Sequence, residues 1–174
     1  MANSAFTAID FETADNGRDS ACAVGLARVE DGKIVRTAHR LIRPPRRDIV
    51  FTYIHGITWE QVENEPLFAG VWPDLAPFFS GIDFIAAHNA PFDKGVLRAC
   101  CAAAGLGVPP QPFTCTVQLA RKELGIRPAT LSNVCHHLSI PLKHHNALSD
   151  AEACAKIMIA VEQVRSGQAA ARLN

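Results

Sequence analysis

The stretch Ala8-Ile9-Asp10-Phe11-Glu12-Thr13 is an apolar run that ends in two carboxylates separated by one residue. Residues 6–12 are rich in β-branched and aromatic side chains, which predicts a buried strand. Side chains alternate between the two faces of a strand, so Asp10 and Glu12 point to the same side. Two carboxylates about 4 Å apart repel by roughly 4 kcal/mol at an effective dielectric near 20. The pair therefore indicates a nearby cation, unless the strand runs out into solvent and both acids are ordinary surface residues.

The composition is that of a neutral globular protein. The chain has 174 residues, 48% of them apolar, and 17 acidic residues balance 17 basic ones. We expect one domain spanning residues 1–174, with a core of about 5–166 and a frayed C-terminal tail. Zero formal net charge provides no general attraction for long nucleic acids, so any such contact must come from a local patch or from metal ions.

The cysteines and the N-terminus bear on the cellular compartment. None of the six cysteines is part of a Cys-x-x-Cys motif, and most lie in apolar segments, which is typical of reduced core residues rather than of a disulfide or zinc framework. Residues 1–5 contain neither a basic region nor an apolar stretch, so no signal peptide is expected. No apolar run is long enough to span a bilayer. We expect a cytoplasmic protein that has no membrane partner.

The order of predicted elements indicates an α/β domain. Strands are expected at residues 6–12, 21–29 and 33–42, and Glu30-Asp31-Gly32 between the last two is a strong hairpin signal. Two short strands follow, at 83–87 and 113–116. Residues 52–58 are expected to form an irregular loop, and helices are expected at 59–63, from Pro66 to about 78, and at 91–105, 117–124, 131–138 and 147–166. This order predicts a mixed sheet flanked by helices.

Two of the predicted helices begin with an acid that faces inward. Asp93 precedes an apolar stripe at helical spacing in the helix that starts near Pro91, and Asp150 does so in the last helix. A carboxylate in a first turn gains about 0.3–1 kcal/mol from the helix N-terminus, so each acid taken alone is also explained as a capping acid. Together with the two acids of the strand, however, they make four carboxylates that converge on one region.

Four converging carboxylates, without a converging lysine or arginine, indicate multivalent cations. Oxygen ligands favour Mg²⁺ or Mn²⁺ over Zn²⁺. Two such ions about 3.5–4 Å apart can activate a water and stabilise the leaving oxygen of a phosphoryl displacement. His145, five residues before Asp150, is the candidate general base. The remaining histidines without an acid or motif partner are expected in surface or packing roles: His39, His136, His137 and His144.

Four segments of the chain resemble motifs of the DnaQ-like 3′→5′ exonucleases of the DEDDh branch. This superfamily includes proofreading exonuclease subunits, RNase T and oligoribonuclease. Asp10-Phe11-Glu12-Thr13 matches the motif D-x-E-T, and His-Asn-Ala-Pro-Phe-Asp at 88–93 matches H-N-A-x-F-D. Residues 145–150 match H-x-x-x-x-D, and residues 55–58 are similar to the family's H-G-I-T segment. The motifs follow the family's order and extend over nearly the whole chain.

The resemblance implies an RNase H-like fold, with a five-stranded sheet of three antiparallel strands followed by two parallel ones. It also implies a nuclease that removes nucleoside 5′-monophosphates from the 3′ ends of single-stranded DNA or RNA, in DNA repair or RNA processing. His145 would deprotonate the attacking water. The implied ligands of two Mg²⁺ or Mn²⁺ ions are Asp10, Glu12, Asp93 and Asp150. The implied substrate contacts are Phe11, Thr13, His55, Ile57, Thr58, Asn89 and Phe92.

Several alternatives stay open at this point. Because Phe92 lies inside a helical turn, core packing is favoured over a nucleotide contact for it, and Asn89 holds either the loop or a phosphate. Asn146 stands where many relatives carry arginine, which removes a basic contact near the scissile phosphate. The basic cluster at 43–47 is either a solvated loop or a phosphate-contacting patch. Alternative functions are an accessory proofreading subunit of a DNA polymerase and a catalytically silent nucleic-acid-binding module; a homodimer is a further possibility for the assembly.

Overall fold

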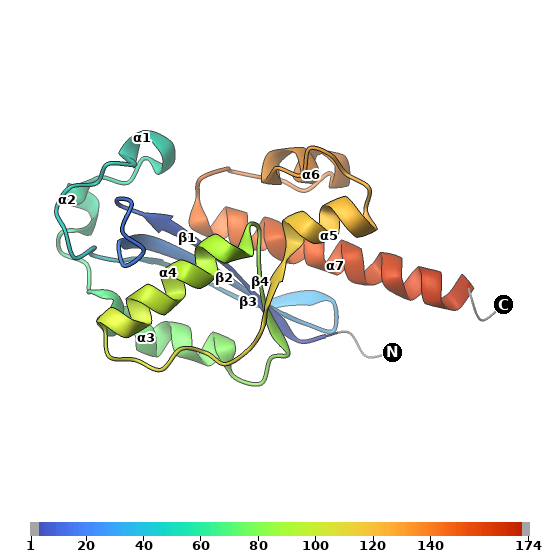
Figure 1. Cartoon of the computed structure of the whole chain (residues 1–174), viewed down its shortest axis with the longest axis horizontal. Coiled ribbons are helices and arrows are strands. Elements are labelled where there is room, and N and C mark those ends of the chain that lie inside the picture. The colour runs from blue at the N-terminus through green and yellow to red at the C-terminus, as the bar shows by residue number, and fades with distance from the viewer. Residues whose placement is uncertain (1–3, 172–174) are drawn as a thin grey trace.

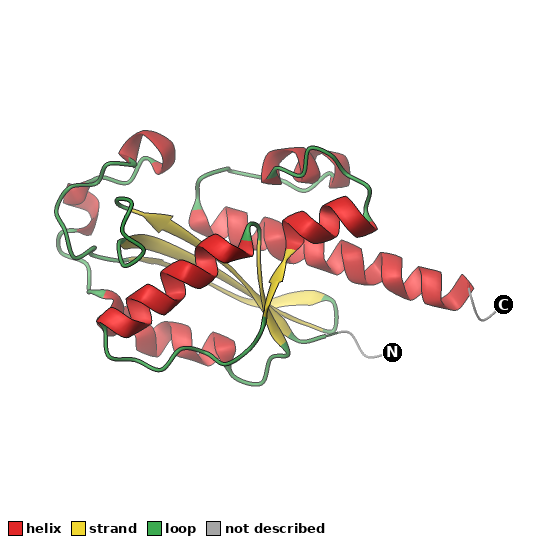
Figure 2. Ribbon diagram, in the orientation of Figure 1, coloured by secondary structure: helices red, strands yellow, loops and turns green. Residues whose placement is uncertain are grey.

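A five-stranded mixed sheet in the order β3-β2-β1-β4-β5 forms the centre of the computed structural model, which describes residues 4–171 and the side chains of 4–167 (Figures 1 and 2). The strands are β1 (Phe6–Thr13), β2 (Ala21–Glu30), β3 (Lys33–Leu41), β4 (Phe84–Ala87) and β5 (Phe113–Cys115). The first three pair antiparallel, and β4 and β5 add parallel to β1. The predicted RNase H-like sheet is confirmed.

Helices cover both faces of this sheet. On one side lie α3 (Phe68–Leu75), the 3-10 turn η1 (Ala76–Phe79) and α4 (Ala90–Ala103). On the other, α7 (Ala147–Ala171) packs across β1 and β2, with α5 (Thr116–Glu123) and α6 (Leu131–Leu138) beside it (Figure 1). Two short helices, α1 (Thr52–His55) and α2 (Trp59–Val62), connect β3 to α3. Among the described residues, no helix is both long and apolar enough to cross a membrane.

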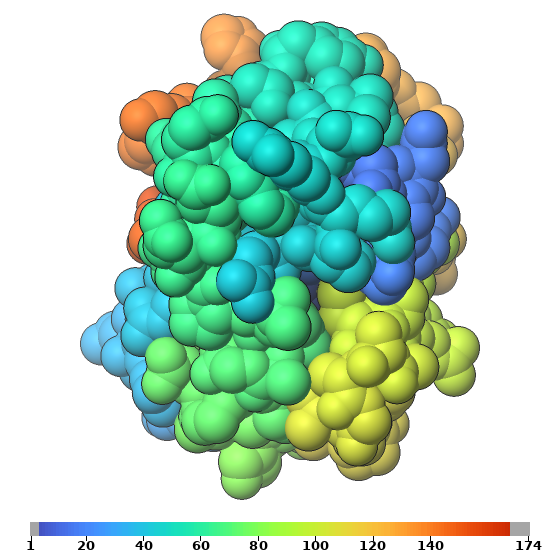
Figure 3. Space-filling model, turned by 90° about the vertical axis from the view of Figure 1, so that its left-hand side faces the viewer, coloured from blue at the N-terminus to red at the C-terminus, as the bar shows by residue number. Residues whose placement is uncertain are grey.

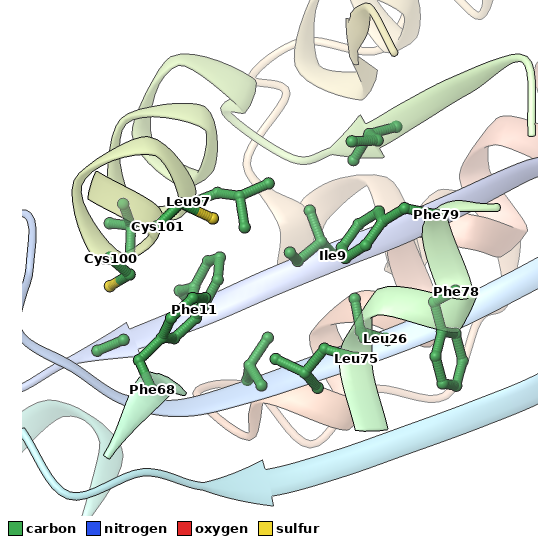
Figure 4. Close-up of a cluster of buried hydrophobic side chains, with 14 of the residues drawn as sticks. Ile9, Phe11, Leu26, Phe68, Leu75, Phe78, Phe79, Leu97, Cys100 and Cys101 are labelled. Atoms are coloured by element: carbon green, nitrogen blue, oxygen red, sulfur yellow. The ribbon is translucent and has the colours of Figure 1, made fainter. Parts of the chain in front are cut away.

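The side chains of β1 alternate between two cores, as predicted for a buried strand. Ile9 and Phe11 pack in the cluster that α3 and α4 complete, where Figure 4 shows them with Leu75 and Leu97. Phe6 and Ala8 pack in the second cluster, against α7. Because side chains two residues apart share a face, Asp10 and Glu12 lie on the α7 side of the sheet.

The β2–β3 turn shows why the predicted hairpin forms. Asp31 has a φ of 48° and Gly32 a φ of 71°, and both values are in the left-handed region that two-residue hairpin turns require. Glycine and aspartate tolerate this region better than other residues do. The cysteines also agree with the sequence analysis, since all six are free thiols and only Cys115 is partly exposed.

Three predicted elements differ from the structure by more than two residues. Residues 52–55 of the predicted irregular loop form the helical turn α1, which ends at Gly56 with a φ of 76°. The segment after Pro66 changes from α-helix to a 3-10 turn at Ala76, because Pro77 lacks the N–H that an α-helical hydrogen bond needs. The last helix runs to Ala171 instead of ending near residue 166. Residues 172–174 of the predicted frayed tail lie outside the described residues.

Gly25 of β2 allows α7 to approach the sheet beside the acids. It pairs with Asp10 across the β1–β2 ladder. A Cβ built on Gly25 would overlap the backbone carbonyl of Ala147, the first residue of α7. Glycine therefore permits the close contact that brings the first turn of α7, which carries Asp150, next to Asp10.

We predict that Gly25→Ala displaces the start of α7. The overlap involves backbone atoms that cannot rotate away, so we expect the free energy of unfolding to fall by about 1–3 kcal/mol. Urea denaturation followed by circular dichroism measures this change.

Gly107→Ala is the matched control for this prediction. No heavy atom of the described chain lies within 4 Å of a Cβ built there. We expect its stability to stay within about 0.5 kcal/mol of the wild type. Equal stability of Gly25→Ala and wild type would show that the helix start tolerates the methyl group.

Candidate active site

Four carboxylates from three elements meet at the C-terminal end of β1. Asp10 and Glu12 come from β1, and an oxygen atom of each lies within 4.8 Å of an oxygen atom of Asp150 from α7. Asp93 of α4 lies beside them, because its Oδ1 accepts a hydrogen bond of 3.0 Å from the backbone N–H of Phe11. The structure thus brings together the four acids that the sequence analysis proposed as a group.

The starts of the two helices place Asp93 and Asp150. Asn89 precedes α4 with a left-handed φ of 83°, which turns the chain sharply from β4 into the helix. The side chain of Asn146 accepts a hydrogen bond of 3.1 Å from the N–H of Ser149, and so caps α7. Both acids therefore lie in first helical turns, where the helix N-terminus favours negative charge.

Burial and mutual repulsion raise the pKa values of these acids. Burial raises the pKa of Asp10 well above its usual value, and the charges of Asp93, Glu12 and Asp150 raise it further. Burial raises the pKa of Glu12 to about 7, with Asp150 adding to the shift. Burial raises the pKa of Asp93 to about 8, despite the hydrogen bond from Phe11. Without a cation, the four groups therefore cannot all be ionised at neutral pH.

The donor set fits a hard divalent cation. Oδ1 of Asp150 is buried and has no hydrogen-bond partner among the described residues, although buried polar atoms are normally paired. Its Oδ2 accepts hydrogen bonds from the ring of His144 and the N–H of His145. An unpaired oxygen atom among oxygen ligands that repel one another is what Mg²⁺ or Mn²⁺ would satisfy. We therefore consider Asp10, Glu12, Asp93 and Asp150 the residues able to hold such ions.

His145 lies at the edge of the same group. Its φ of 61° is left-handed, and its ring stacks on that of His144 with centroids 3.9 Å apart. Burial and the neighbouring His144 lower the pKa of His145, while Asp150 opposes the change. A neutral imidazole at pH 7 is able to accept a proton from water.

The expectation that His144 has no acid partner was wrong. Its Nδ1 lies 3.0 Å from Oδ2 of Asp150. The left-handed turn at His145 and the cap at the next residue fold the preceding chain back over the start of α7. Because His144 lies in a turn and Asp150 at the start of a helix, no periodic pattern indicates this contact.

Three of the acids, Asp10, Glu12 and Asp150, line a cleft of about 360 Å³, whereas Asp93 is buried. Four of the predicted substrate contacts line it, namely Phe11, Thr13, His55 and Phe92. The other three take part in local structure: Ile57 N–H donates to the ring of His55, Thr58 forms the capping box of α2, and Asn89 makes the turn before α4. Further lining residues, which the sequence analysis did not identify, are Phe51, Ile54, His88, Leu131 and His144.

The structure bears on two of the alternatives, the role of Phe92 and the role of the basic cluster at 43–47. Phe92 both packs against the α3–α4 core and lines the cleft. In the basic cluster, Arg46 binds the carboxylates of Asp15 and Asp19 at 2.7 and 2.6 Å. This arginine therefore holds the β1–β2 loop in place. Its pairing with two acids favours a structural role for the basic cluster over phosphate contact.

Three clustered acids and a histidine that line an open cleft, with a fourth acid buried beside them, fit a nuclease, a class of phosphodiester hydrolase. Comparison with known proteins identifies the family. Residues 7–158 match the family model of the RNase T type, described as exonuclease. The chain belongs to this family of DnaQ-like exonucleases.

The relatives include proteins much longer than this chain. A PolC-type DNA polymerase III from Thermotoga petrophila is 34% identical over 162 residues, which cover 90% of this chain but 12% of that protein. Exodeoxyribonuclease 10 from Escherichia coli K12 is 32% identical over 146 residues, covering 78% of this chain and 60% of that protein. The chain thus spans only a small part of the polymerase relatives it matches.

Two solved structures resemble the whole chain. Exonuclease X in complex with 5′ overhanging duplex DNA has a TM-score of 0.73 and 27% identity, with 91% of each chain covered. The nuclease domain of 3′hExo, a DEDDh family member bound to rAMP, has a TM-score of 0.76 and 17% identity, with 92% of each chain covered. The second likeness shows the shared fold.

We predict that the metal-free protein loses stability as pH rises from about 4 to about 8. Across this window the folded state binds more protons than the unfolded state, because Glu12 and Asp93 have raised pKa values of about 7 and about 8. Stability therefore falls with pH. Urea titrations in EDTA at several pH values measure the slope, and added Mg²⁺ should reduce the loss.

Asp10→Asn should flatten this dependence, because it removes one charge from the group. We expect it to stabilise the metal-free protein at pH 8 by about 0.5–2 kcal/mol, as relief of a functional constraint commonly does. Asp74→Asn is the control, since Asp74 is exposed and paired with Arg40. An Asp10→Asn slope as steep as that of the wild type would contradict the repulsion.

Proposed function

We propose that this protein is a two-metal 3′→5′ exonuclease that hydrolyses single-stranded DNA or RNA and releases nucleoside 5′-monophosphates. The observation that carries the proposal is that Asp10, Glu12 and Asp150 line an open cleft beside His145, with Asp93 buried next to them. The family to which the chain belongs supports the same activity. The volume of the cleft, about 360 Å³, is at the small end of ligand pockets, which favours removal of one nucleotide at a time.

The residues of the cleft would have distinct roles in this reaction. The four acids would hold two Mg²⁺ or Mn²⁺ ions, which supply a water of lowered pKa and neutralise charge at the scissile phosphate. His145 would accept a proton from the attacking water, since its ring is neutral near pH 7. Phe11 and Thr13, together with His55 and Phe92, would contact the terminal nucleotide.

A second candidate function is proofreading together with a DNA polymerase. The PolC-type polymerase relative favours it, because 162 of its residues match 90% of this chain. Co-purification with a polymerase would support this alternative.

A catalytically silent binding module is less well supported, because that role requires neither the four acids nor His145. We place the protein in the cytoplasm, since all six cysteines are free thiols, and light scattering would test for a homodimer.

We predict Mg²⁺-dependent release of mononucleotides from an oligonucleotide labelled at its 3′ end. Asp10→Ala should abolish this release, because it removes a ligand from the centre of the acid group. Chromatography should identify the product as a nucleoside 5′-monophosphate. Equal rates for wild type and Asp10→Ala would refute an exonuclease site at these residues.

His145→Ala and Asp150→Ala should separate proton transfer from metal binding. Loss of a general base typically lowers kcat by about 10²–10⁴-fold, so His145→Ala should lose most turnover but still bind metal. Asp150→Ala should lose both. His137, whose ring contacts the carbonyl of Asn133 on α6, provides the control variant His137→Ala. Calorimetric titration with Mn²⁺ measures the binding, and equal affinity of Asp150→Ala and wild type would exclude Asp150 as a ligand.

A further inference from the structure

Exposed apolar side chains concentrate just before and within α1. Among the described residues, the large exposed apolar side chains include Val50 at 54%, Tyr53 at 80% and Ile54 at 40%, all within five positions. The others, Val35, Leu67 and Val108, lie in separate segments. All four residues of α1 are described and none is buried. Packing in the core therefore does not explain why this helix presents apolar groups.

Hydrogen bonds hold α1 against the acidic site at both ends. At its start, the N–H of Phe51 donates to the carbonyl of Ala14 over 3.2 Å. At its end, Nε2 of His55 lies 3.1 Å from the carbonyl of Thr13. Thr13 and Ala14 directly follow Glu12 in the chain. The position of α1 is therefore fixed relative to the carboxylates.

Aromatic surface continues from the cleft to the outside of α1. Phe51 and Ile54 line the cleft. The ring of Tyr53 meets the ring of Phe51 edge-on, with centroids 6.4 Å apart and planes at 68°. In the view of Figure 3, the segment containing α1 and α2, coloured cyan to teal, forms the upper part of the molecular surface. A strand that leaves the cleft on this side would cross Tyr53.

We propose that Tyr53 is a stacking platform for an unpaired base of the substrate strand, next to the terminal nucleotide in the cleft. This proposal rests on the proposed exonuclease function and adds a second substrate contact to it. Aromatic rings bind the flat faces of all four bases, so such a contact provides affinity without sequence preference. The chain has zero formal net charge and no general attraction for a polyanion, so local contacts of this kind are needed.

The test compares a long substrate with one that cannot reach Tyr53. The long substrate is a single-stranded oligonucleotide of about ten residues, and the short one is the p-nitrophenyl ester of thymidine 5′-monophosphate. For Tyr53→Ala we expect KM for the oligonucleotide to rise about five- to tenfold, the lower part of the range for loss of one stacked base. Kinetics with the ester should not change.

Two further variants distinguish stacking from a general disturbance. Tyr53→Trp keeps a flat ring and should keep the KM of the wild type for the oligonucleotide. Val35→Ala is the control variant, because Val35 lies on β3 and has the same exposed fraction as Val50, 54%. It should leave KM for the oligonucleotide unchanged. If Tyr53→Ala lost activity on both substrates, the ring would be needed for catalysis itself, and the proposed stacking role would be wrong.

A binding measurement separates this proposal from the proposed function. Fluorescence anisotropy in EDTA reports oligonucleotide affinity without catalysis, and Tyr53→Ala should weaken it about five- to tenfold. If Tyr53 contributes to oligonucleotide affinity but the wild type cleaves neither substrate, the stacking role is supported and the exonuclease proposal fails. Unchanged oligonucleotide affinity in Tyr53→Ala would overturn the platform and leave α1 as a surface for a protein partner.

Discussion

Four carboxylates repel one another at the C-terminal end of β1, and the strands and helices around them hold them together. Pairing of β1 with β2 at Asp10 and Glu12 fixes the backbone of both acids, so they cannot separate. Asp93 and Asp150 arrive on helices that pack on opposite faces of the sheet. Burial raises the pKa values of all four, and neighbouring carboxylates raise those of Asp10, Glu12 and Asp93 further. The fold thus maintains an arrangement that is unfavourable without a cation, as functional sites often do.

Several features far apart in the sequence serve this arrangement. Gly25 leaves room for the first turn of α7, and Asn146 caps that turn. The backbone N–H of Phe11 holds Asp93 against β1. His144 occupies one oxygen of Asp150, which leaves the other without a partner among the described residues. These contacts help to hold the carboxylates of Asp10, Glu12 and Asp150 close enough to share an ion, with Asp93 beside them.

Periodic patterns in the sequence predicted the sheet, its flanking helices and the grouping of the acids. Alternation along residues 6–12 placed Asp10 and Glu12 on one face, and helical spacing placed Asp93 and Asp150 at inward helix starts. These signals are strong because each extends over a buried element. The order of the four motifs along the chain indicated the family.

Features that arise from tertiary structure were not predictable. The helix α1 has four residues and buries none of them, so it produces no apolar periodicity. For the same reason, Phe51 and Ile54 were missed as cleft residues, and Ile57 and Thr58 were expected there instead. The contact between His144 and Asp150 depends on the left-handed turn at His145, which no local pattern indicates.

The raised pKa values of the acids indicate a site for divalent ions. Calorimetric titration with Mn²⁺ at pH 7, in two buffers of different ionisation enthalpy, measures binding and proton release together. We predict that ion binding displaces at least one proton, because Glu12 and Asp93 have pKa values of about 7 and about 8 in the metal-free protein. Binding without proton release, or binding no tighter than in a variant lacking Asp10 and Asp150, would contradict the account.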